Sequence, residues 1–204
     1  TSTGAELTDL GSAGVVQGLD GERSIGANAK AKFKGLTLTA KWNQRKKQVP
    51  TAPLRATVGL PGTEYTDARG FTELRYEHEF FSRLTLTARV AYDASRYRGY
   101  YATLDENGER SRSTDSGGGD WLSAEVRGGL FLFEGNRLTL GVEGQAQFVY
   151  QQPAGLDARA NTTRTFFSAT LLDEWQLFNN RLFLQAGVRV DKYNDIGEFA
   201  LSPR

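Results

Sequence analysis

Apolar and polar residues alternate strictly along several stretches of this chain. From Leu138 to Phe148, Leu140 and Val142 lie on one side of an extended chain, while Thr139 and Glu143 lie on the other. A period of two is the pattern of a β-strand, because successive side chains of a strand point to opposite faces. The same alternation predicts further strands over residues 36–43, 84–93 and 182–191.

These four strands begin alike, which indicates an internal repeat. The segments that start at residues 35, 83, 137 and 181 read Gly-Leu-Thr-Leu, Arg-Leu-Thr-Leu, Arg-Leu-Thr-Leu and Arg-Leu-Phe-Leu. Each follows a short turn, and another alternating stretch precedes each turn, near residues 25–33, 72–80, 122–133 and 164–177. The repeat unit is therefore a hairpin. The sequence predicts an all-β antiparallel meander of about eight long strands, with hairpins at 24–44, 70–97, 120–151 and 163–193.

The connections differ between the two ends of the predicted sheet. At one end the turns are short, at residues 34–35, 81–83, 134–137 and 178–181. At the other end the stretches 45–69, 98–119 and 151–163 are polar and read as long loops. Long strands with short turns on one side and long loops on the other are typical of a transmembrane β-barrel of the outer membrane.

The apolar side of the strands has aromatic residues at both ends. Rings at both edges of an apolar band form the girdle expected where lipid meets water. The girdle residues are Trp42, Tyr92, Phe148 and Tyr150 toward the long loops, and Phe33, Phe80 and Trp175 toward the short turns. We therefore expect outer-membrane lipid to be the partner of this face.

The opposite side of the strands carries charges, which we interpret as a wall around a water-filled interior. If Leu130 pairs with Leu140 in the third hairpin, Arg127 lies opposite Glu143. In the second hairpin, Glu77 can reach Arg89 directly or diagonally. A soluble sandwich with an aromatic core is the alternative, and it leaves these charges unexplained. The expected wall residues, as ordinary ion pairs rather than a dedicated substrate path, are Glu73, Arg75, Glu77, Arg89, Glu125, Arg127, Glu143 and Arg189.

Composition narrows the possible functions. Lys and Arg total 25 and Asp and Glu total 24, giving a net charge of +1, which argues against nucleic acid as a partner. The chain has no Cys and a single His, His78, so neither a disulfide framework nor a multi-histidine metal centre is expected. Residues 1–19 are polar and have no apolar core of a signal peptide. The absence of Met adds to the expectation of a processed or excised piece.

Several segments resemble one family. Arg45–Ala52 opens a long loop, and Tyr65–Phe71 leads into the strand Glu73–Phe80. Asp173-Glu-Trp175 precedes the Leu-rich strand Arg181–Asp191, and Ser-Pro-Arg204 begins a further strand. This arrangement resembles the middle-to-late barrel of TonB-dependent outer-membrane receptors, and the resemblance covers nearly the whole chain.

The resemblance implies active uptake of siderophore-bound iron, cobalamin or another bulky solute across the outer membrane. It implies the TonB energy-coupling system as a partner, through a plug domain that this sequence does not contain. Barrels of the family have 22 strands, so residues 1–204 are expected to be one barrel segment. The alternatives are a complete eight-stranded barrel with a structural or adhesion role, and a passive porin.

Other motifs are weaker. Arg45, Lys46 and Lys47 lie just beyond Trp42, where they are candidates for contact with lipopolysaccharide phosphates or for a solvated loop base. Residues 105–109 read as a solvated hairpin tip rather than a calcium loop, and residues 115–120 as a flexible loop base rather than a phosphate cradle. His78 has Ser82 and Ser95 near it in sequence, but no acid is placed to orient it, so no enzyme, catalytic residue or cofactor is expected.

Overall fold

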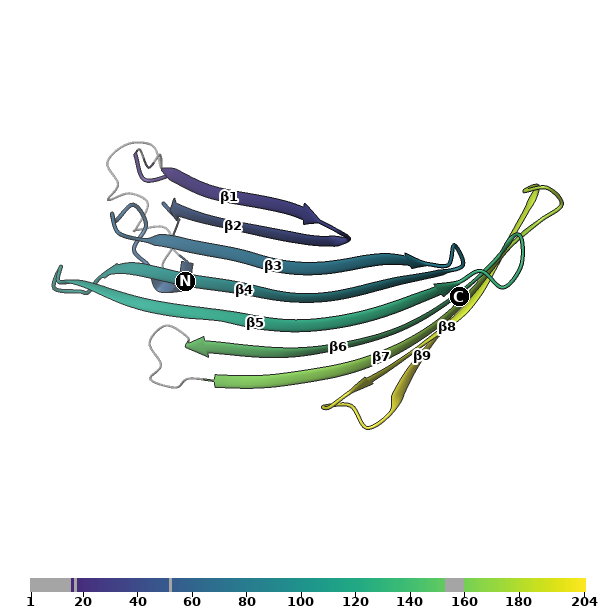
Figure 1. Ribbon diagram of the computed structural model, residues 1–204. Helices are drawn as coiled ribbons and strands as arrows, with labels where there is room; N and C mark the ends of the chain where they lie inside the picture. Colours follow the sequence, from purple (N-terminus) through teal and green to yellow (C-terminus); the bar gives the residue numbers. More distant parts are fainter. Residues whose placement is uncertain (1–15, 17, 52, 153–159) are drawn as a thin grey trace.

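One antiparallel sheet of nine strands makes up the described part of the molecule (Figure 1). The computed structural model describes residues 16, 18–51, 53–152 and 160–204, and a short 3-10 turn, η1 (Pro53–Arg55), lies between the second and third strands. The strands are β1 (Glu22–Phe33), β2 (Leu36–Gln48), β3 (Glu64–Phe80), β4 (Leu84–Leu104), β5 (Arg110–Leu130), β6 (Asn136–Gln152), β7 (Ala160–Leu177), β8 (Leu182–Tyr193) and β9 (Phe199–Pro203). The predicted all-β meander is confirmed, and β9 adds a ninth strand where the sequence expects a further one to begin.

The described sheet is open. Every strand pairs with its neighbour in the chain, and the order ends at β1 on one side and β9 on the other. In Figure 1 the strands form a single curved layer, with purple β1 and yellow β9 at its two edges. Because β1 and β9 do not pair, the described strands are not the closed eight-stranded barrel that the sequence left as an alternative.

Pairing extends further toward the loop end than the sequence predicts. Residues 98–119 were expected to form a long loop, but β4 and β5 stay paired out to Leu104 and Arg110. Their connection is only residues 105–109, where the Asp105 carboxylate accepts hydrogen bonds from the amides of Asn107 and Glu109. Beyond the apolar band both faces of a strand are polar, so alternation no longer reveals a strand that the backbone ladder still extends.

At the turn end, the connection between β5 and β6 also differs from the prediction. The expected strand 122–133 and turn 134–137 shift, because β5 ends at Leu130 and the turn covers residues 131–135. Gly135 has a φ of +78°, and a Cβ there would lie 2.5 Å from the carbonyl oxygen of Gln176 on β7. Its own carbonyl accepts a 2.6 Å hydrogen bond from the Gln176 amide. Only glycine combines this conformation with so close an approach.

The sheet has two distinct faces and almost no core. In the described part of the chain the buried hydrophobic residues are only Ala56, Ala91, Tyr101 and Ala102. We call one side the apolar face; Leu74, Val90, Leu122, Val142 and Phe167 lie on it, each about half exposed. The other side, which carries Glu73, Arg89, Glu125 and Glu143, we call the charged face. A soluble sandwich would cover its apolar face with a second layer, and none is present among the described residues.

Two further observations concern membrane-spanning helices and the predicted segments that lie outside the described residues. No helix among the described residues is both long enough and apolar enough to cross a membrane. The N-terminal stretch without a signal-peptide pattern falls largely on residues 1–15 and 17, which lie outside the described residues, as do residues 153–159 of the expected loop 151–163.

Candidate functional site: the ion-pair chain of the charged face

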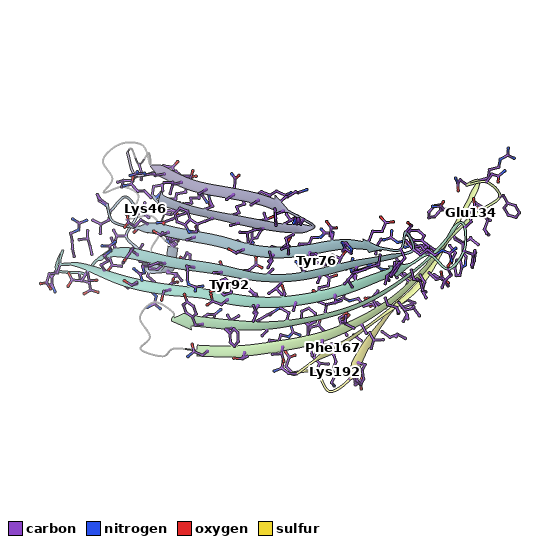
Figure 2. The ribbon with its side chains drawn as sticks, in the orientation of Figure 1. Lys46, Tyr76, Tyr92, Glu134, Phe167 and Lys192 are labelled. Atoms are coloured by element: carbon purple, nitrogen blue, oxygen red, sulfur yellow. The ribbon has the colours of Figure 1, made fainter. Side chains whose placement is uncertain are left out.

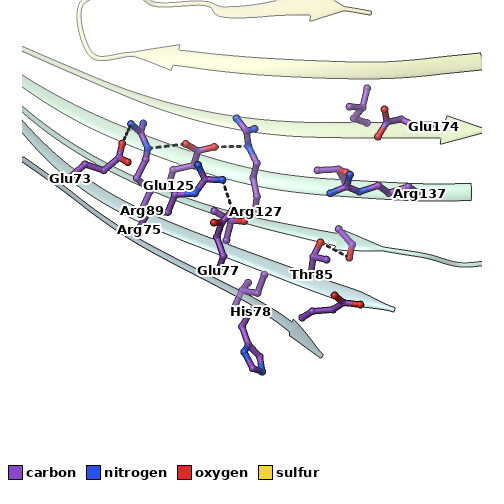
Figure 3. Close-up of a pocket in the computed structure, with 16 residues that line it drawn as sticks. Glu73, Arg75, Glu77, His78, Thr85, Arg89, Glu125, Arg127, Arg137 and Glu174 are labelled. Carbon is purple, nitrogen blue, oxygen red and sulfur yellow. Dashed lines mark hydrogen bonds and ion pairs between the residues drawn. The ribbon is translucent and has the colours of Figure 1, made fainter. Parts of the chain in front are cut away.

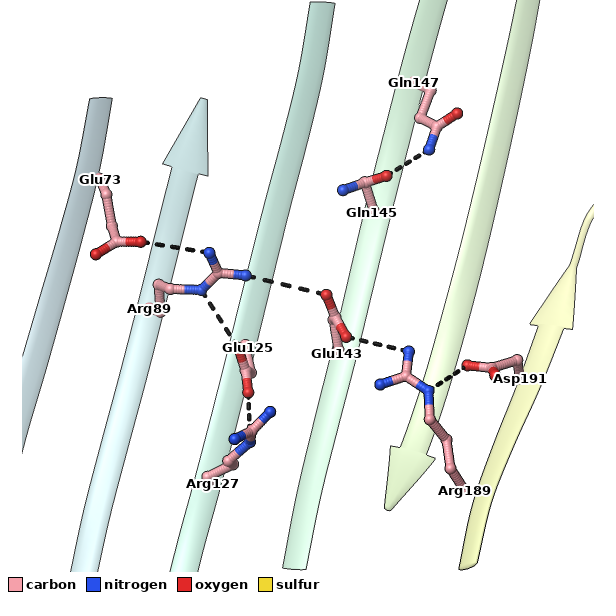
Figure 4. Close-up of polar contacts among 9 residues, drawn as sticks. All are labelled: Glu73, Arg89, Glu125, Arg127, Glu143, Gln145, Gln147, Arg189 and Asp191. Atoms are coloured by element: carbon pink, nitrogen blue, oxygen red, sulfur yellow. Dashed lines mark hydrogen bonds and ion pairs between the residues drawn. The ribbon is translucent and has the colours of Figure 1, made fainter. Parts of the chain in front are cut away.

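A continuous chain of ion pairs crosses the charged face from β3 to β8 (Figure 4). Arg89 of β4 is its centre. Its guanidinium lies 3.3 Å from Glu73 of β3, 3.2 Å from Glu125 of β5 and 4.0 Å from Glu143 of β6. One arginine therefore joins carboxylates from three other strands, and charged groups that share partners are positioned more firmly than isolated surface pairs.

The chain continues on both sides of this centre. Glu143 also accepts from Arg189 of β8 at 3.3 Å, and Arg189 donates to Asp191 at 2.9 Å. Glu125 pairs with Arg127 of its own strand at 2.5 Å. The carboxylates at the centre of the chain are largely shielded from solvent, with 16% of the Glu125 side chain and 20% of the Glu143 side chain exposed, whereas 58% of the Arg127 side chain is exposed. Three arginines face four carboxylates, so this part of the wall is close to charge balance.

Small residues on the sheet make room for these long side chains. Ser168 of β7 stands between Glu143 and Asp191 in the register and is 2% exposed. Ala91 and Ser123, which neighbour Glu73 and Glu125, are also buried. Arginine and glutamate side chains therefore lie flat across the neighbouring strands instead of standing out from the sheet.

An open hollow of about 760 Å³ lies beside the ion-pair chain toward the turn end (Figure 3). Arg75 and Glu77 form a 2.6 Å pair at its edge, and Arg137 and Glu174 face it from β6 and β7. The wall of the hollow thus offers both cations and carboxylates. Such a surface can form hydrogen bonds and ion pairs with a polar protein segment or a charged solute.

The structure places all eight predicted wall residues on the charged face, but some partners differ from those expected. Leu130 pairs with Leu138, two residues from the expected Leu140, so Arg127 lies opposite Gly141 rather than Glu143. The predicted Arg127–Glu143 pair is therefore wrong, since β5 ends its pairing earlier and the five-residue turn takes up the difference. Glu77 stands diagonal to Arg89 in the register, but its carboxylate pairs with Arg75.

A tyrosine cluster at the loop end of the charged face was not predicted. Tyr101 is 1% exposed, and its hydroxyl lies 2.8 Å from that of Tyr97 and 3.1 Å from the carboxylate of Asp115. The ring of Tyr65 packs edge-on against Tyr101 at 5.9 Å. Burial raises the pKa of the Tyr101 hydroxyl, so it remains a hydrogen-bond donor at neutral pH. The sequence hid this cluster because Tyr65, Tyr101 and Asp115 fall in stretches that read as loops.

All seven predicted girdle residues lie on the apolar face. Trp42, Tyr92 and Phe148 are between 42% and 49% exposed, and Phe33 beside the first turn is 68% exposed. The others are Phe80, Tyr150 and Trp175. In Figure 2, Tyr92 and Phe167 are labelled on the middle strands of the sheet.

The three basic residues 45–47 do not act together. Arg45 and Lys47 lie on the charged face and pair with Glu22 and Asp20, at 2.8 and 2.6 Å. Lys46 alone lies on the apolar face, 2.9 Å from Glu64. The alternation of a strand separates neighbours in this way, and β2 continues through these residues to Gln48.

His78 is exposed on the apolar face and lies beside two aromatic rings of its own strand. Its imidazole stacks on Tyr76 with ring centres 6.0 Å apart and meets Phe80 edge-on at 4.3 Å. No hydrogen bond joins it to Ser82 or Ser95 among the contacts of the described residues. The described residues also hold no group of three or more His, Cys, Asp or Glu side chains suited to a metal ion.

Comparisons with known proteins identify the fold. A ferric enterobactin receptor from Pseudomonas aeruginosa, a point mutant in complex with enterobactin, matches with a TM-score of 0.61 and 19% identity, over 89% of this chain and 30% of that one. The ferric-catecholate import receptor of E. coli K12 in its closed form matches with a TM-score of 0.58 and 11% identity, over 90% of this chain and 38% of that one.

These matches establish the fold as part of the barrel of TonB-dependent siderophore receptors, which the sequence resemblance predicted. The chain spans about a third of the length of the receptors that it matches. No family model matches the sequence, and no curated protein does. The matched proteins are receptors, and no enzyme family is indicated.

Proposed function

We propose that this chain forms part of the outer-membrane barrel of a receptor that takes up a ferric siderophore by energy-coupled transport. The observation that carries the proposal is the match of 89% of the chain to the barrel of a ferric enterobactin receptor. The catecholate class of siderophore is favoured within the proposal because the E. coli receptor with the same fold imports ferric catecholates.

In this proposal the apolar face meets lipid. Half-exposed Leu, Val and Phe side chains along the middle of every long strand are unfavourable in water, and no second layer of the described chain covers them. Lipid removes this surface from water without any close-packed partner. The localisation that follows is the Gram-negative outer membrane, in which the short turns face the periplasm.

The charged face then lines the wet interior. Ion pairs such as Arg89–Glu125 cost little to keep beside water, whereas an arginine facing the middle of the hydrocarbon would cost about 2–4 kcal/mol. The open hollow at the turn end would supply a polar surface for a plug domain inside the barrel. TonB would act through that plug, and the siderophore would reach this chain from the loop end.

Iron uptake in a suitable host tests the proposal. The full-length protein is expressed in an E. coli strain that lacks its own catecholate receptors, and uptake of radioactive iron bound to enterobactin is measured with and without TonB. We expect uptake that is saturable and requires TonB. A matched control strain expresses the same protein with its plug domain deleted, which should abolish coupled uptake.

The alternatives give different results. A passive porin would admit small solutes without TonB and would show no saturation with ferric enterobactin. A structural or adhesion barrel would support no uptake of any ferric siderophore. Either result would contradict the proposal.

A further inference from the structure

A groove runs along the apolar face near its loop end, outside the ion-pair chain. It has a volume of about 360 Å³ and lies between the rings of Trp42 and Tyr92. Its floor is made of short side chains from four neighbouring strands. The floor residues are Ala27, Ala29, Ala40, Gly70, Thr72 and Ala94.

The groove forms because small residues of neighbouring strands lie side by side in the sheet. Ala29 pairs with Ala40, and Gly70 lies between Trp42 and Ala94. Larger residues border this area, so the sheet surface sinks between two aromatic walls. A groove with a nearly uncharged floor and ring-shaped walls accommodates a hydrocarbon chain.

Cations lie immediately beyond the groove, toward the loops. Arg23, Lys46 and Arg98 fall in a single row of the register, on β1, β2 and β4, with Thr66 of β3 between the last two. Arg96 lies one row closer to the groove. Because adjacent strands are about 4.8 Å apart, the row extends over about 14 Å.

Only part of this positive charge is neutralised. Arg96 binds Asp120 at 2.7 Å and Lys46 binds Glu64 at 2.9 Å. Arg23 and Arg98 have no ion-pair partner among the described residues, and about half of the Lys46 side chain is exposed. Glu64 is shared with Arg112 of β5, 3.2 Å away, so five cations and two carboxylates leave a net charge of +3 beside the apolar groove.

We propose that this groove and the cation row bind one phosphorylated, multiply acylated glycolipid of the outer leaflet, the lipid A portion of lipopolysaccharide. An acyl chain would lie between Trp42 and Tyr92, and the headgroup phosphates would meet Lys46 and the two arginines of the row. Figure 2 labels Lys46 and Tyr92, which belong to the two parts of this site.

Charge complementarity selects this occupant. A row of separated cations fits a headgroup with a phosphate on each sugar of a disaccharide, whereas a glycerophospholipid brings one phosphate to one point. Arginine and lysine are the side chains that bind phosphate most strongly. The inference rests on the membrane location in the proposed function, and it replaces the expected trio 45–47 with residues that share one face.

A second groove on the apolar face can be compared with the first. It is lined by residues that include Gly128, Val142, Ala169 and Val190, and it has a volume of about 520 Å³. Its lining contains no charged residue. If hydrocarbon fit alone decided lipid retention, both grooves would hold lipid A equally; the proposal assigns it to the first.

Native mass spectrometry of the full-length protein in mild detergent tests the site, with diphosphoryl lipid A as the probe. The charge variant is Arg23→Gln with Lys46→Gln and Arg98→Gln. Its matched control removes three lysines from the opposite face of β1 and β2, Lys30→Gln, Lys32→Gln and Lys47→Gln. The groove variant is Ala40→Phe with Ala94→Phe, and its control is Gly128→Phe with Ala169→Phe in the second groove.

Each cation near an anionic lipid headgroup contributes about fivefold in affinity, so the charge variant should bind lipid A roughly a hundredfold more weakly. The groove variant should also lose binding, and both controls should keep it. Unchanged affinity in the charge variant would overturn the proposal. Equal binding of phosphatidylglycerol by the unaltered protein would overturn the choice of lipid A.

Iron uptake, measured on the same variants, separates this inference from the proposed function. Weakened lipid A binding with TonB-dependent uptake intact supports the site as a lipid site alone. An unaltered protein that binds lipid A but transports no ferric siderophore would contradict the proposed function and leave the lipid site supported.

Discussion

Arg189 of β8 reaches across β7 to Glu143 of β6, with 3.3 Å between the guanidinium and the carboxylate. On β7, Ser168 lies directly opposite Glu143 and is 2% exposed, and Thr170 lies opposite Arg189. The small serine thus allows an ion pair to join two strands that share no backbone hydrogen bond. Contacts of this kind resist sliding of β7 relative to both of its neighbours.

Filling the space at Ser168 should break this contact. Ser168→Leu is expected to lower the free energy of unfolding by about 1–3 kcal/mol, because the added methyl groups displace Arg189 and leave Glu143 with a weaker partner. Urea unfolding of the full-length protein in lipid vesicles measures the change. Ser168→Ala is the control and should cost less, since it keeps the space open; equal losses in the two variants would contradict this role for Ser168.

The observed register predicts which charges are coupled. A double-mutant cycle on Glu143→Gln and Arg189→Gln should give a coupling energy of about 0.2–1 kcal/mol, modest because both groups are partly exposed. The cycle on Glu143→Gln and Arg127→Gln should give none within error, because Arg127 pairs with Glu125. Coupling in the second cycle and not in the first would favour the register with Leu130 opposite Leu140 and contradict the one observed.

Two glycines with nearly the same backbone conformation should respond differently to alanine. Gly108 has a φ of +79° and nothing within 4 Å of an added Cβ, so Gly108→Ala should cost only the conformational strain, about 1–2 kcal/mol. Gly135→Ala adds a 2.5 Å approach to the Gln176 carbonyl and should cost about 1–3 kcal/mol more. Unfolding of both variants in vesicles gives the difference, and equal losses would show that the turn at 131–135 relaxes freely.

The environment of the apolar face can be tested by adding bulk to it. Val142→Leu with Gly144→Leu places larger apolar side chains where an added Cβ at Gly144 would have its nearest neighbour, the Phe166 carbonyl oxygen, at 3.9 Å. Fluid lipid accommodates them, so stability in vesicles should change by no more than about 0.5 kcal/mol. Ala91→Leu on the charged face is the control, because Ala91 is 4% exposed and overpacking there should cost about 1–3 kcal/mol.

Val142→Arg tests the polarity of the same surroundings. A charge near the middle of the hydrocarbon should cost about 2–4 kcal/mol. The two results must be taken together, because a packed protein core would also reject arginine. A large loss in the Val142→Leu and Gly144→Leu variant would indicate a close-packed partner on this face and contradict lipid contact.

The sequence by itself determined the strands of the apolar band, their antiparallel order and the composition of the two faces. Alternation at 84–93 or 138–148 has a period of two, which is sufficient to define both a strand and its faces. The register of the first hairpin also follows from its two-residue turn, which pairs Ala27 with Trp42 and Ala31 with Leu38.

Only the tertiary structure decided the contacts that depend on where a strand ends. The apolar run from Leu130 to Phe133 concealed the end of β5, and this moved the partner of Arg127 by two residues. The polar stretches at 98–119 concealed the extension of β4 and β5, and with it the Tyr101 cluster. Alternation reports the difference between two environments, so it carries no information where both faces are polar or where an apolar residue lies in a turn. The groove between Trp42 and Tyr92 likewise joins residues of four strands, whose neighbourhood arises only from pairing.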